Sequence, residues 1–275
     1  MILRVGAPMW AHPPWRVRLG FTRGRELADY ATWCNSVEGN TTFYAVPSEA
    51  TVERWSEQAP ADFRFVFKAP RAVTHDHRLG HGAHGELASF LRAVRPLSDR
   101  MGPILLQLPP SFDRLDVLAE FVIGLPTSFR WSVELRHRTF FDGDGRRRVD
   151  EVLRTAGVGR TVLDTRPLYQ RPVTTAAGVE ERRTKPDLPV TLDHVGDEPI
   201  VRVIHGDHPD SDGLSRWVPT VARWLEHGLR PYVFVHRPDN ESSPEDARRF
   251  HAMVSASVAA VTPLPEPSGL DPGLF

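Results

Sequence analysis

The segment Trp131-Ser132-Val133-Glu134-Leu135-Arg136-His137 is a short apolar run that ends in an acid, a guanidinium and an imidazole. Moving ionisable side chains out of water at the end of a buried strand is costly, so such groups usually persist for chemistry or for ion pairing. Other apolar runs of the chain end in the same way: Phe67-Lys68, Leu106-Gln107, Leu163-Asp164, Ile204-His205 and Val235-His236. The pattern predicts one polar site assembled from several strand ends.

Apolar runs and amphipathic stretches alternate along the chain. The runs expected to form strands are Leu3–Ala7, Ser36–Glu38, Phe63–Lys68, Pro103–Gln107, Trp131–Glu134, Gly159–Leu163, Ile200–His205 and Tyr232–His236. The stretches with helical period are Glu26–Trp33, Glu49–Gln58, Glu86–Leu97, Leu115–Ile123, Val149–Thr155, Trp217–Glu226 and Glu245–Val254. This alternation indicates a parallel sheet with right-handed crossovers, and eight repeats favour a single closed (β/α)8 barrel of the TIM type over an open sheet.

Two stretches depart from this repeat. Residues Thr165–Glu198 contain proline and arginine without a clear helical period, so we expect a lid or an irregular covering segment in place of the sixth helix. The end of the chain is rich in proline, as in Thr262-Pro263-Leu264-Pro265-Glu266-Pro267. The prediction is one barrel domain over residues 1–260 and a loosely packed tail over residues 261–275.

Charge and cysteine content exclude several classes of protein. The formal net charge of -1 over 275 residues gives no global attraction to nucleic acid or to an anionic membrane. One cysteine, Cys34, excludes an intrachain disulfide and a multi-thiolate zinc site within the chain, and we expect it to be a small buried thiol. The first residues lack the apolar stretch of a secretory signal and no run reaches transmembrane length, so we expect a cytoplasmic protein that does not bind membranes.

The basic residues are strongly biased towards arginine. Lys68 and Lys185 are the only lysines among 34 lysine and arginine residues. A lysine that survives this bias at a strand end is a candidate for something arginine cannot do, such as losing its proton. We therefore assign a functional role to Lys68, whereas Lys185 lies in a polar loop and is interpreted as a chance survivor.

In a TIM-type barrel, function is expected at the carboxyl ends of the strands and in the loops that follow them. We predict Lys68, Glu134 and Asp164 as catalytic residues. The residues predicted to bind substrate are Trp10, Glu38, Asn40, Tyr44, His75, Gln107, Arg136, His137, Arg202, His205, Gly206, His236 and Asn240.

Seven ordered motifs make the sequence resemble a known family. They are Val37–Tyr44, Phe67–Pro70 with Thr74-His75, Leu105–Phe112, Val133–His137, Asp164, Val201–Gly206 and His236–Asn240. In this order they resemble the YecE-like proteins, catalogued as domain of unknown function 72, over roughly residues 3 to 255. The resemblance implies a TIM-type barrel with its site at these motifs, but no reaction, because the activity of the family is not established. Gly39 and the length of Thr165–Glu198 depart from the family's usual pattern.

Two interpretations remain open for the charged residues. Glu134 and Arg136 share one face of a strand, so they either form a buried ion pair or make Glu134 a general acid or base tuned by Arg136 and Lys68. Arg202, with His205 and Gly206, either clamps an anion at the mouth of the barrel or satisfies a neighbouring carboxylate such as Asp164.

Metal and aromatic sites are open to two interpretations as well. His137, His205 and His236 with Glu134 and Asp164 could hold a divalent metal, but no fixed-spacing signature supports it, and we predict no cofactor. Trp10, Trp15, Phe43 and Tyr44 form either an aromatic wall for a sugar or base, or part of the core.

The sequence therefore predicts an enzyme, a hydrolase, lyase or isomerase, that acts on a small phosphorylated or carboxylated molecule by lysine and glutamate acid–base chemistry. A Schiff base on the lysine is a variant of this hypothesis. The alternatives are a nucleic-acid-binding or phosphodiester-processing (endonuclease-like) barrel and a barrel that binds a ligand without turnover. The sequence does not predict the oligomeric state.

Overall fold

A computed structural model describes residues 1–207 and 213–267. Each of the eight runs expected to form a strand coincides with one, although β2 and β6 extend one residue further, and all the paired strands are parallel. The strands are β1 (Arg4–Gly6), β2 (Ser36–Gly39), β3 (Arg64–Phe67), β4 (Ile104–Gln107), β5 (Trp131–Glu134), β6 (Gly159–Asp164), β7 (Ile200–Ile204) and β8 (Tyr232–His236).

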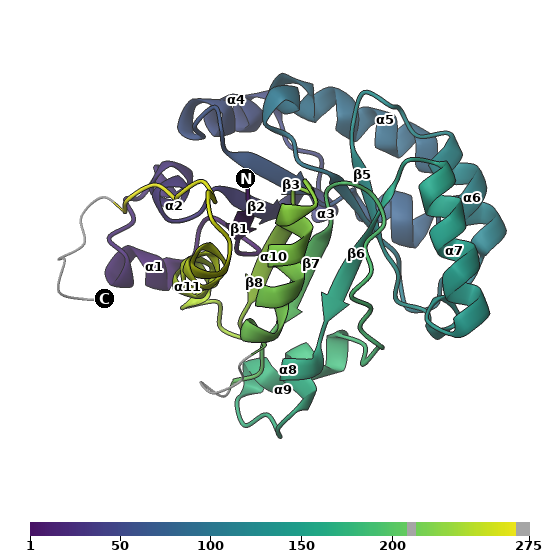
Figure 1. The fold of residues 1–275 in the computed structure, drawn as a ribbon. Helices are drawn as coiled ribbons and strands as arrows, with labels where there is room; N and C mark the ends of the chain where they lie inside the picture. The colour runs from purple at the N-terminus through teal and green to yellow at the C-terminus, as the bar shows by residue number, and fades with distance from the viewer. Residues whose placement is uncertain (208–212, 268–275) are drawn as a thin grey trace.

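Helices surround the strands on the outside (Figure 1). They are α1 (Pro13–Arg18), α2 (Glu26–Trp33), α3 (Thr41–Tyr44), α4 (Glu49–Gln58), α5 (Ala83–Val94), α6 (Leu115–Ile123), α7 (Gly143–Thr155), α8 (Arg166–Tyr169), α9 (Ala176–Thr184), α10 (Val218–Glu226) and α11 (Ser243–Ser257). The predicted bounds of α2, α4 and α6 are confirmed. These stretches were recognisable because their apolar residues recur at helical spacing, as Leu118, Phe121 and Val122 do on the buried face of α6. Within the described ranges, none of the helices has the length and apolarity needed to cross a membrane.

The expected closed barrel is wrong. The strands form a six-stranded parallel sheet in the order β1-β8-β7-β6-β5-β4 and a separate two-stranded sheet of β2 and β3. The fold is α/β, as expected, but the ladder of backbone hydrogen bonds stops between β1 and β2 and again between β3 and β4. Counting strand–helix repeats predicts the number and direction of strands, but it does not reveal whether every neighbouring pair forms a ladder.

Side chains replace most of the hydrogen bonds between β1 and β2, although the N–H of Glu38 still bonds to the carbonyl of Ala7 at 3.1 Å. The Asn35 side chain accepts from the backbone N–H of Val5 at 2.9 Å and donates to the carbonyl of Leu3 at 2.8 Å. The Tyr30 hydroxyl lies between the two strands and donates to the carbonyl of Ser36 at 3.0 Å. A Cβ on Gly6 would lie 2.0 Å from that same carbonyl oxygen, so the approach of β1 to β2 depends on glycine.

The gap between β3 and β4 is bridged at two separate points. The isolated bridges pair Phe65 with Met101 and Lys68 with Leu105. Their hydrogen bonds run from the N–H of Gly102 to the carbonyl of Phe65 at 2.7 Å and from the N–H of Ala69 to the carbonyl of Leu105 at 2.9 Å. The two sheets therefore stay in register without forming one ladder.

Both sheets face a common apolar interior. This small cluster consists of Val66, Leu105, Ile200, Tyr232 and Phe234. Because side chains alternate along a strand, residues two positions further along lie on the same face at the carboxyl ends of these strands. Those residues are Lys68, Gln107, Arg202 and His236. The alternation thus stacks a polar layer directly on the apolar interior.

The segment after β6 covers one part of this polar end. It contains two helices, α8 and α9, which lie below the carboxyl ends of β6 and β7 in Figure 1. The C-terminal stretch 261–267 packs more closely than predicted: the N–H of Thr262 bonds to the carbonyl of Met1 at 2.9 Å, and Leu264 packs against the main core. Residues 268–275 of the predicted tail lie outside the described residues.

Candidate functional site

A cluster of seven polar side chains occupies the carboxyl ends of the strands. All seven are buried, and six of them come from or directly follow six different strands. The members of this polar cluster are Glu38, Lys68, Gln107, Glu134, Arg136, Arg202 and His236. All seven were predicted from the sequence as site residues, and the structure brings them together.

Arg202 is the centre of the polar cluster. Its Nε and Nη2 donate to the two carboxylate oxygens of Glu38 at 2.7 and 2.8 Å, and its Nη1 donates to Oε2 of Glu134. The side chain is only 1% exposed. The buried charge is therefore compensated in the paired, forked geometry that arginine favours. One of the two interpretations from the sequence is that Arg202 pairs with a neighbouring carboxylate such as Asp164. Arg202 does pair with carboxylates, but they belong to Glu38 and Glu134.

Arg136 extends the network on the other side of Glu134. Its Nε donates to Oε1 of Glu134 at 2.6 Å, and its Nη2 donates to the Gln107 side-chain oxygen at 2.9 Å. Both oxygens of Glu134 are thus occupied by guanidinium groups. The result is a chain of alternating charges from Glu38 through Arg202 and Glu134 to Arg136.

The arginines keep both carboxylates ionised. Burial by itself raises the pKa of Glu134, but the charge of Arg202, followed by those of Arg136 and Lys68, lowers that pKa to about 2. Burial likewise opposes ionisation of Glu38, and Arg202 together with His236 holds its pKa well below the ordinary value. The Nε2 atom of His236 lies 3.1 Å from Glu38, while burial lowers the pKa of the imidazole. A carboxylate held in this way is a poor proton carrier near neutral pH.

The Lys68 side chain makes weaker polar contacts than the arginines beside it. Its Nζ lies 3.9 Å from Glu38, and no hydrogen bond to Nζ occurs within the described part of the chain. Burial, and then the charge of Arg202, lower the pKa of Lys68 to about 7, although Glu38 and Glu134 oppose this. The amine therefore changes its protonation near neutral pH and keeps its hydrogen-bonding capacity for another molecule.

An aromatic and an imidazole ring flank the Lys68 amine. The Nζ atom lies 5.3 Å from the centre of the Phe43 ring, which in turn meets His75 edge-on at 5.0 Å. Burial and the charge of Arg136 lower the pKa of His75 to about 4, so its ring is neutral at physiological pH. The Thr42 hydroxyl donates a hydrogen bond to the Lys68 carbonyl at 2.7 Å and so fixes the backbone of Lys68.

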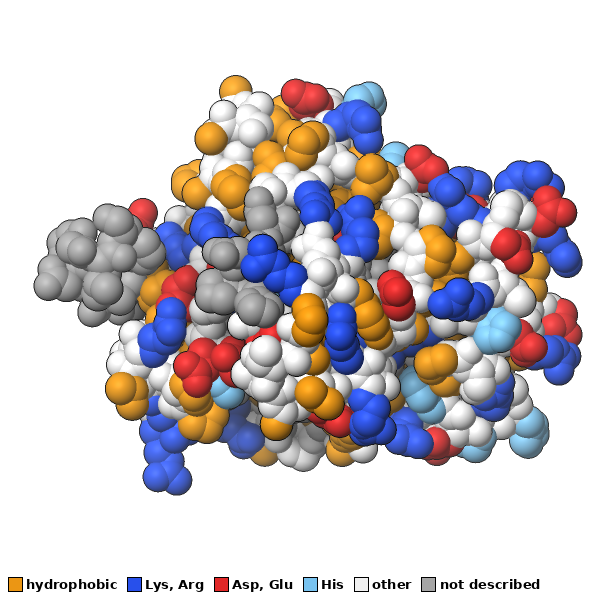
Figure 2. All heavy atoms as spheres, turned by 90° about the horizontal axis from the view of Figure 1, so that it is seen from below, with side chains coloured by type: hydrophobic (Ala, Val, Ile, Leu, Met, Phe, Trp, Pro, Cys, Tyr) orange, Lys and Arg blue, Asp and Glu red, His pale blue; other side chains and the backbone are white. Residues whose placement is uncertain are grey.

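Four side chains give the polar cluster its access to solvent. Lys68 and Arg136 are each 8% exposed, Gln107 is 7% and His236 is 6%, whereas Glu38 and Glu134 are fully buried. A ligand that reaches the cluster would meet these four side chains before the carboxylates. Figure 2 looks onto this end of the molecule, where Lys and Arg side chains occur across the middle of the face.

Asp164 lies in a different network. It alternates with Leu163 onto the opposite face of β6, where it accepts hydrogen bonds from the side chain of Arg166 at 2.8 and 2.9 Å and from Nε1 of Trp217 at 2.7 Å. These contacts point towards the helical layer. Asp164 was predicted as a catalytic residue, but the structure does not bring it to Lys68 or Glu134.

Several other predicted substrate-binding residues lie apart from the polar cluster. Trp10 packs edge-on against Trp55 at 5.1 Å, and Tyr44 is 80% exposed. The remaining ones bond to their own surroundings: Asn40 to the carbonyl of Pro8, His137 to Thr139, and Asn240 through its carbonyl to Trp15. Of these, the His137 side chain caps the short helical turn that follows it.

His205 and Gly206 follow β7 as predicted. The backbone N–H of His205 bonds to the carbonyl of His236 at 2.9 Å, and its side chain is buried. Gly206 lies close to α8, where a Cβ would be 3.3 Å from the carbonyl of Pro167. Asp207, next along, accepts from the N–H groups of Thr174 and Thr175 at 2.6 and 2.7 Å and so ties this loop to the start of α9.

Sequence reasoning missed one residue of this end of the molecule, Lys185. Its side chain is 18% exposed, and Arg202, Arg136 and Glu134 all act on its pKa. The signal was present in the composition, because Lys185 is the second of only two lysines in an arginine-rich chain. Its place in a polar loop concealed that the loop folds back over the strand ends.

The donor set does not favour a metal. In residues 1–207 and 213–267, His, Cys, Asp and Glu side chains do not gather in groups of three or more that could hold an ion. The oxygens of Glu38 and Glu134 are already bonded to guanidinium groups. Cys34 is buried, as expected, and burial raises the pKa of its thiol to about 12.

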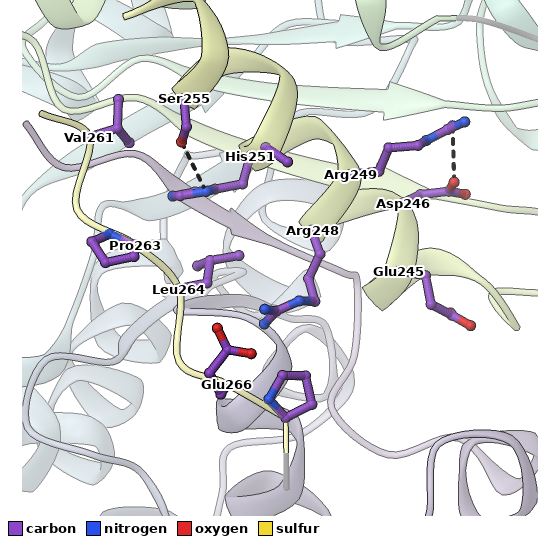
Figure 3. A pocket seen from close by; sticks show the side chains of 12 residues that line it. Glu245, Asp246, Arg248, Arg249, His251, Ser255, Val261, Pro263, Leu264 and Glu266 are labelled. Carbon is purple, nitrogen blue, oxygen red and sulfur yellow. Dashed lines mark hydrogen bonds and ion pairs between the residues drawn. The ribbon is translucent and has the colours of Figure 1, made fainter. Parts of the chain in front are cut away.

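A hollow of about 770 Å³ lies elsewhere, between α11 and the C-terminal stretch (Figure 3). Arg248, His251 and Glu266 line it, together with paired groups such as Arg249 and Asp246 at 3.1 Å. Its wall ends at Pro267, the last described residue of the chain. None of the residues of the polar cluster lines it, so its size gives it no claim to the chemistry.

Comparison with known proteins decides the family. The family described as "Protein of unknown function DUF72" matches residues 4–269. The chain belongs to the DUF72 family. It is 37% identical over 249 residues to the "UPF0759 protein YecE" of Escherichia coli (strain K12), covering 89% of each chain, and 36% identical to the protein of that name from Escherichia coli O157:H7, also over 89% of each. The resemblance stated from the motifs is therefore confirmed.

Solved structures share the fold at low sequence identity. A DUF72 family protein from Enterococcus faecalis V583 aligns with a TM-score of 0.66 at 15% identity, covering 93% of this chain and 97% of that one. Another from Thermotoga maritima MSB8 aligns with a TM-score of 0.63 at 19% identity, covering 94% and 99%. The DUF72 fold thus extends over nearly the whole chain.

Proposed function

We propose that this protein is an enzyme that acts on a small anionic molecule, with Lys68 as the group that accepts and returns a proton. The proposal rests on the surroundings of the Lys68 amine. It is buried beside two arginine–glutamate pairs, and its Nζ has no hydrogen bond among the described residues. An amine that is about half neutral near pH 7 in a site of cations suits proton abstraction next to an oxyanion.

The other members of the polar cluster support this chemistry without carrying the proton. Glu38 and Glu134 hold Arg202 and Arg136 in place and stay ionised, so Glu134 is not the base in this proposal. Arg136, Gln107 and His236 present donors at the solvent side of the cluster. Those lyase and isomerase reactions that begin by removing a proton fit this arrangement best. A nucleic-acid role has less support, because the net charge is -1 and both arginines are already paired.

Solvent exchange tests the proposal without knowledge of the product. Small carboxylates and phosphate monoesters are incubated with the protein in D₂O, and proton NMR reports any C–H bond that exchanges or any new product. We expect exchange or turnover with at least one compound and its loss in Lys68→Met. A neutral amine can also form a Schiff base, so borohydride trapping with carbonyl compounds is the parallel assay, read as a mass increase at Lys68. Activity that persists in Lys68→Met would contradict the proposal.

A further inference from the structure

The segment that follows β6 is fastened across the carboxyl ends of β5 and β6. Three successive carbonyls at its crossing point accept hydrogen bonds from different elements. Lys185 O accepts from the Tyr169 hydroxyl at 2.7 Å, Pro186 O from the Thr165 hydroxyl at 3.0 Å, and Asp187 O from Nη2 of Arg138 at 3.5 Å. Thr165 directly follows β6, and Arg138 lies four residues after the end of β5. The crossing point is therefore fixed relative to Glu134.

Lys185 stands at this crossing point with its side chain largely covered. Its Nζ lies 3.7 Å from Oε2 of Glu181, one turn back on α9, which is longer than a hydrogen bond. Oε2 of Glu181 is itself buried without a hydrogen-bond partner among the described residues. The ammonium group is therefore held near an acid without being fully bound by it.

The same buried charges act on the pKa values of Lys185 and Lys68. Burial and then Arg202 lower the pKa of each lysine, with Arg136 adding to the effect, while Glu134 raises both values. Lys185 in turn acts on His236. Together with the hydrogen bonds that fix the crossing point at the ends of β5 and β6, these shared influences indicate that Lys185 lies beside the polar cluster.

Among the described residues of the polar cluster, taken together with Lys185 and Glu181, four cationic side chains accompany three acids. Glu38 and Glu134 balance Arg202 and Arg136 through direct bonds. Lys68 and Lys185, when protonated, add two positive charges, and Glu181 is the acid paired with Lys185. Gathering like charges in a place with little solvent is unfavourable unless an anion joins them.

We propose that Lys185 is a cationic ligand of the substrate, which holds an oxyanion group, carboxylate or phosphate, beside the Lys68 amine. The anion displaces Glu181 as the partner of Lys185. The segment after β6 thereby contributes a binding residue to the site. This inference rests on the proposed function, because it assigns the part of the anionic substrate that faces Lys68.

The two lysines make a direct test possible. Protein that carries [13C,15N]lysine gives only two side-chain Nζ signals, which Lys68→Met and Lys185→Gln assign. The probes are inorganic phosphate and malonate, titrated against sodium chloride at matched ionic strength. We expect both signals to shift along one saturation curve. Lys185→Gln is expected to weaken binding, read at the Lys68 signal, by about tenfold, the loss of one charge-assisted contact. Lys185→Arg, which keeps the charge, retains most of the affinity.

Arg183→Gln is the matched control, since it removes a charge from the same helix at a side chain that is 71% exposed. It should leave the curve unchanged. A shift of the Lys68 signal alone, or an unchanged affinity in Lys185→Gln, would overturn the role of Lys185 and leave the proposed function standing. If neither signal responds to either probe, anion binding at Lys68 is wrong and both proposals fall.

Discussion

Lys68 and Arg202 show how one buried cluster treats two cations differently. Arg202 uses all three of its nitrogens on Glu38 and Glu134, and these carboxylates raise its pKa despite the opposing effect of burial. Lys68 has only a distant contact at 3.9 Å to the same Glu38. Burial and the neighbouring guanidinium then dominate, so its pKa falls to about 7. The difference is one of geometry, because a planar fork matches a carboxylate and an ammonium group does not.

This lowered pKa makes stability depend on pH. Between about 7 and the ordinary 10.5, the unfolded chain holds the proton on Lys68 and the folded chain does not. The free energy of unfolding of the wild type should therefore rise with pH relative to Lys68→Met, by at most about 1.4 kcal/mol per pH unit. Urea unfolding of both proteins across this range measures the difference. Parallel curves would show that Lys68 titrates normally in the fold.

Breaking the buried network should be costly. Glu38→Gln keeps the shape of the side chain but leaves Arg202 with one carboxylate, so we expect the free energy of unfolding to fall by about 3 to 5 kcal/mol. Asp116→Asn is the control, because Asp116 and its partner Arg114 are both exposed, and its effect should be close to zero. Equal effects of the two substitutions in urea unfolding would contradict the structural role given to Glu38.

The site could be predicted from the sequence as far as strand ends reveal it. Lys68, Gln107 and Glu134 were found because each ends an apolar run. Asp164 ends a run as well, but it alternates onto the outer face of β6, where Trp217 binds it. Side chains alternate between the two faces of a strand, and which alternating set faces inwards depends on the tilt of the sheet and the helices around it. A short buried run does not show which set this is, because both of its faces are apolar.

The segment after β6 is the element whose role the sequence left open. It was expected to be a lid or an irregular covering, and it forms α8 and α9 with the stretch from Lys185 to Asp187 beyond them. Its path depends on single hydrogen bonds to backbone carbonyls, in particular those of the Tyr169 hydroxyl to Arg182 near the end of α9 and to Lys185 directly after it. Hydrophobic periodicity does not predict bonds of this kind, which is why Lys185 was overlooked.

Removing the Tyr169 hydroxyl should loosen this element and little else. In Tyr169→Phe, we expect faster amide exchange over residues 176–187 and faster tryptic cleavage after Arg182 and Arg183, with a global loss of about 1 kcal/mol. Tyr44→Phe is the matched control, since Tyr44 is 80% exposed. Hydrogen exchange followed by mass spectrometry measures the effect. Unchanged protection in Tyr169→Phe would show that other contacts fix the segment.

At the scale of the whole molecule, the strand count was right and the closure was wrong. Eight apolar runs form eight strands, but the ladder breaks where Asn35 and Tyr30 bond across β1 and β2. These two residues look ordinary in the sequence. Their effect arises from contacts between separate segments, so it became visible only in three dimensions.

The junction of the two sheets can be tested through two glycines. Gly6→Ala places a Cβ against the carbonyl of Ser36 and should lower the free energy of unfolding by about 3 kcal/mol or more. Gly143→Ala, at the first residue of α7, meets nothing within 4 Å and should be neutral or stabilise by up to about 1 kcal/mol. Thermal or urea unfolding distinguishes the two. A mild effect of Gly6→Ala would mean that β1 and β2 can separate at little cost.

The most direct test of the account is the pKa of the Lys68 side chain, measured from the Nζ chemical shift of lysine-labelled protein as pH is varied. We expect a midpoint at about 7, with the signal absent in Lys68→Met. A midpoint near the ordinary 10.5 would contradict it, because Lys68 would then be a permanently charged partner of Glu38 and not a proton carrier.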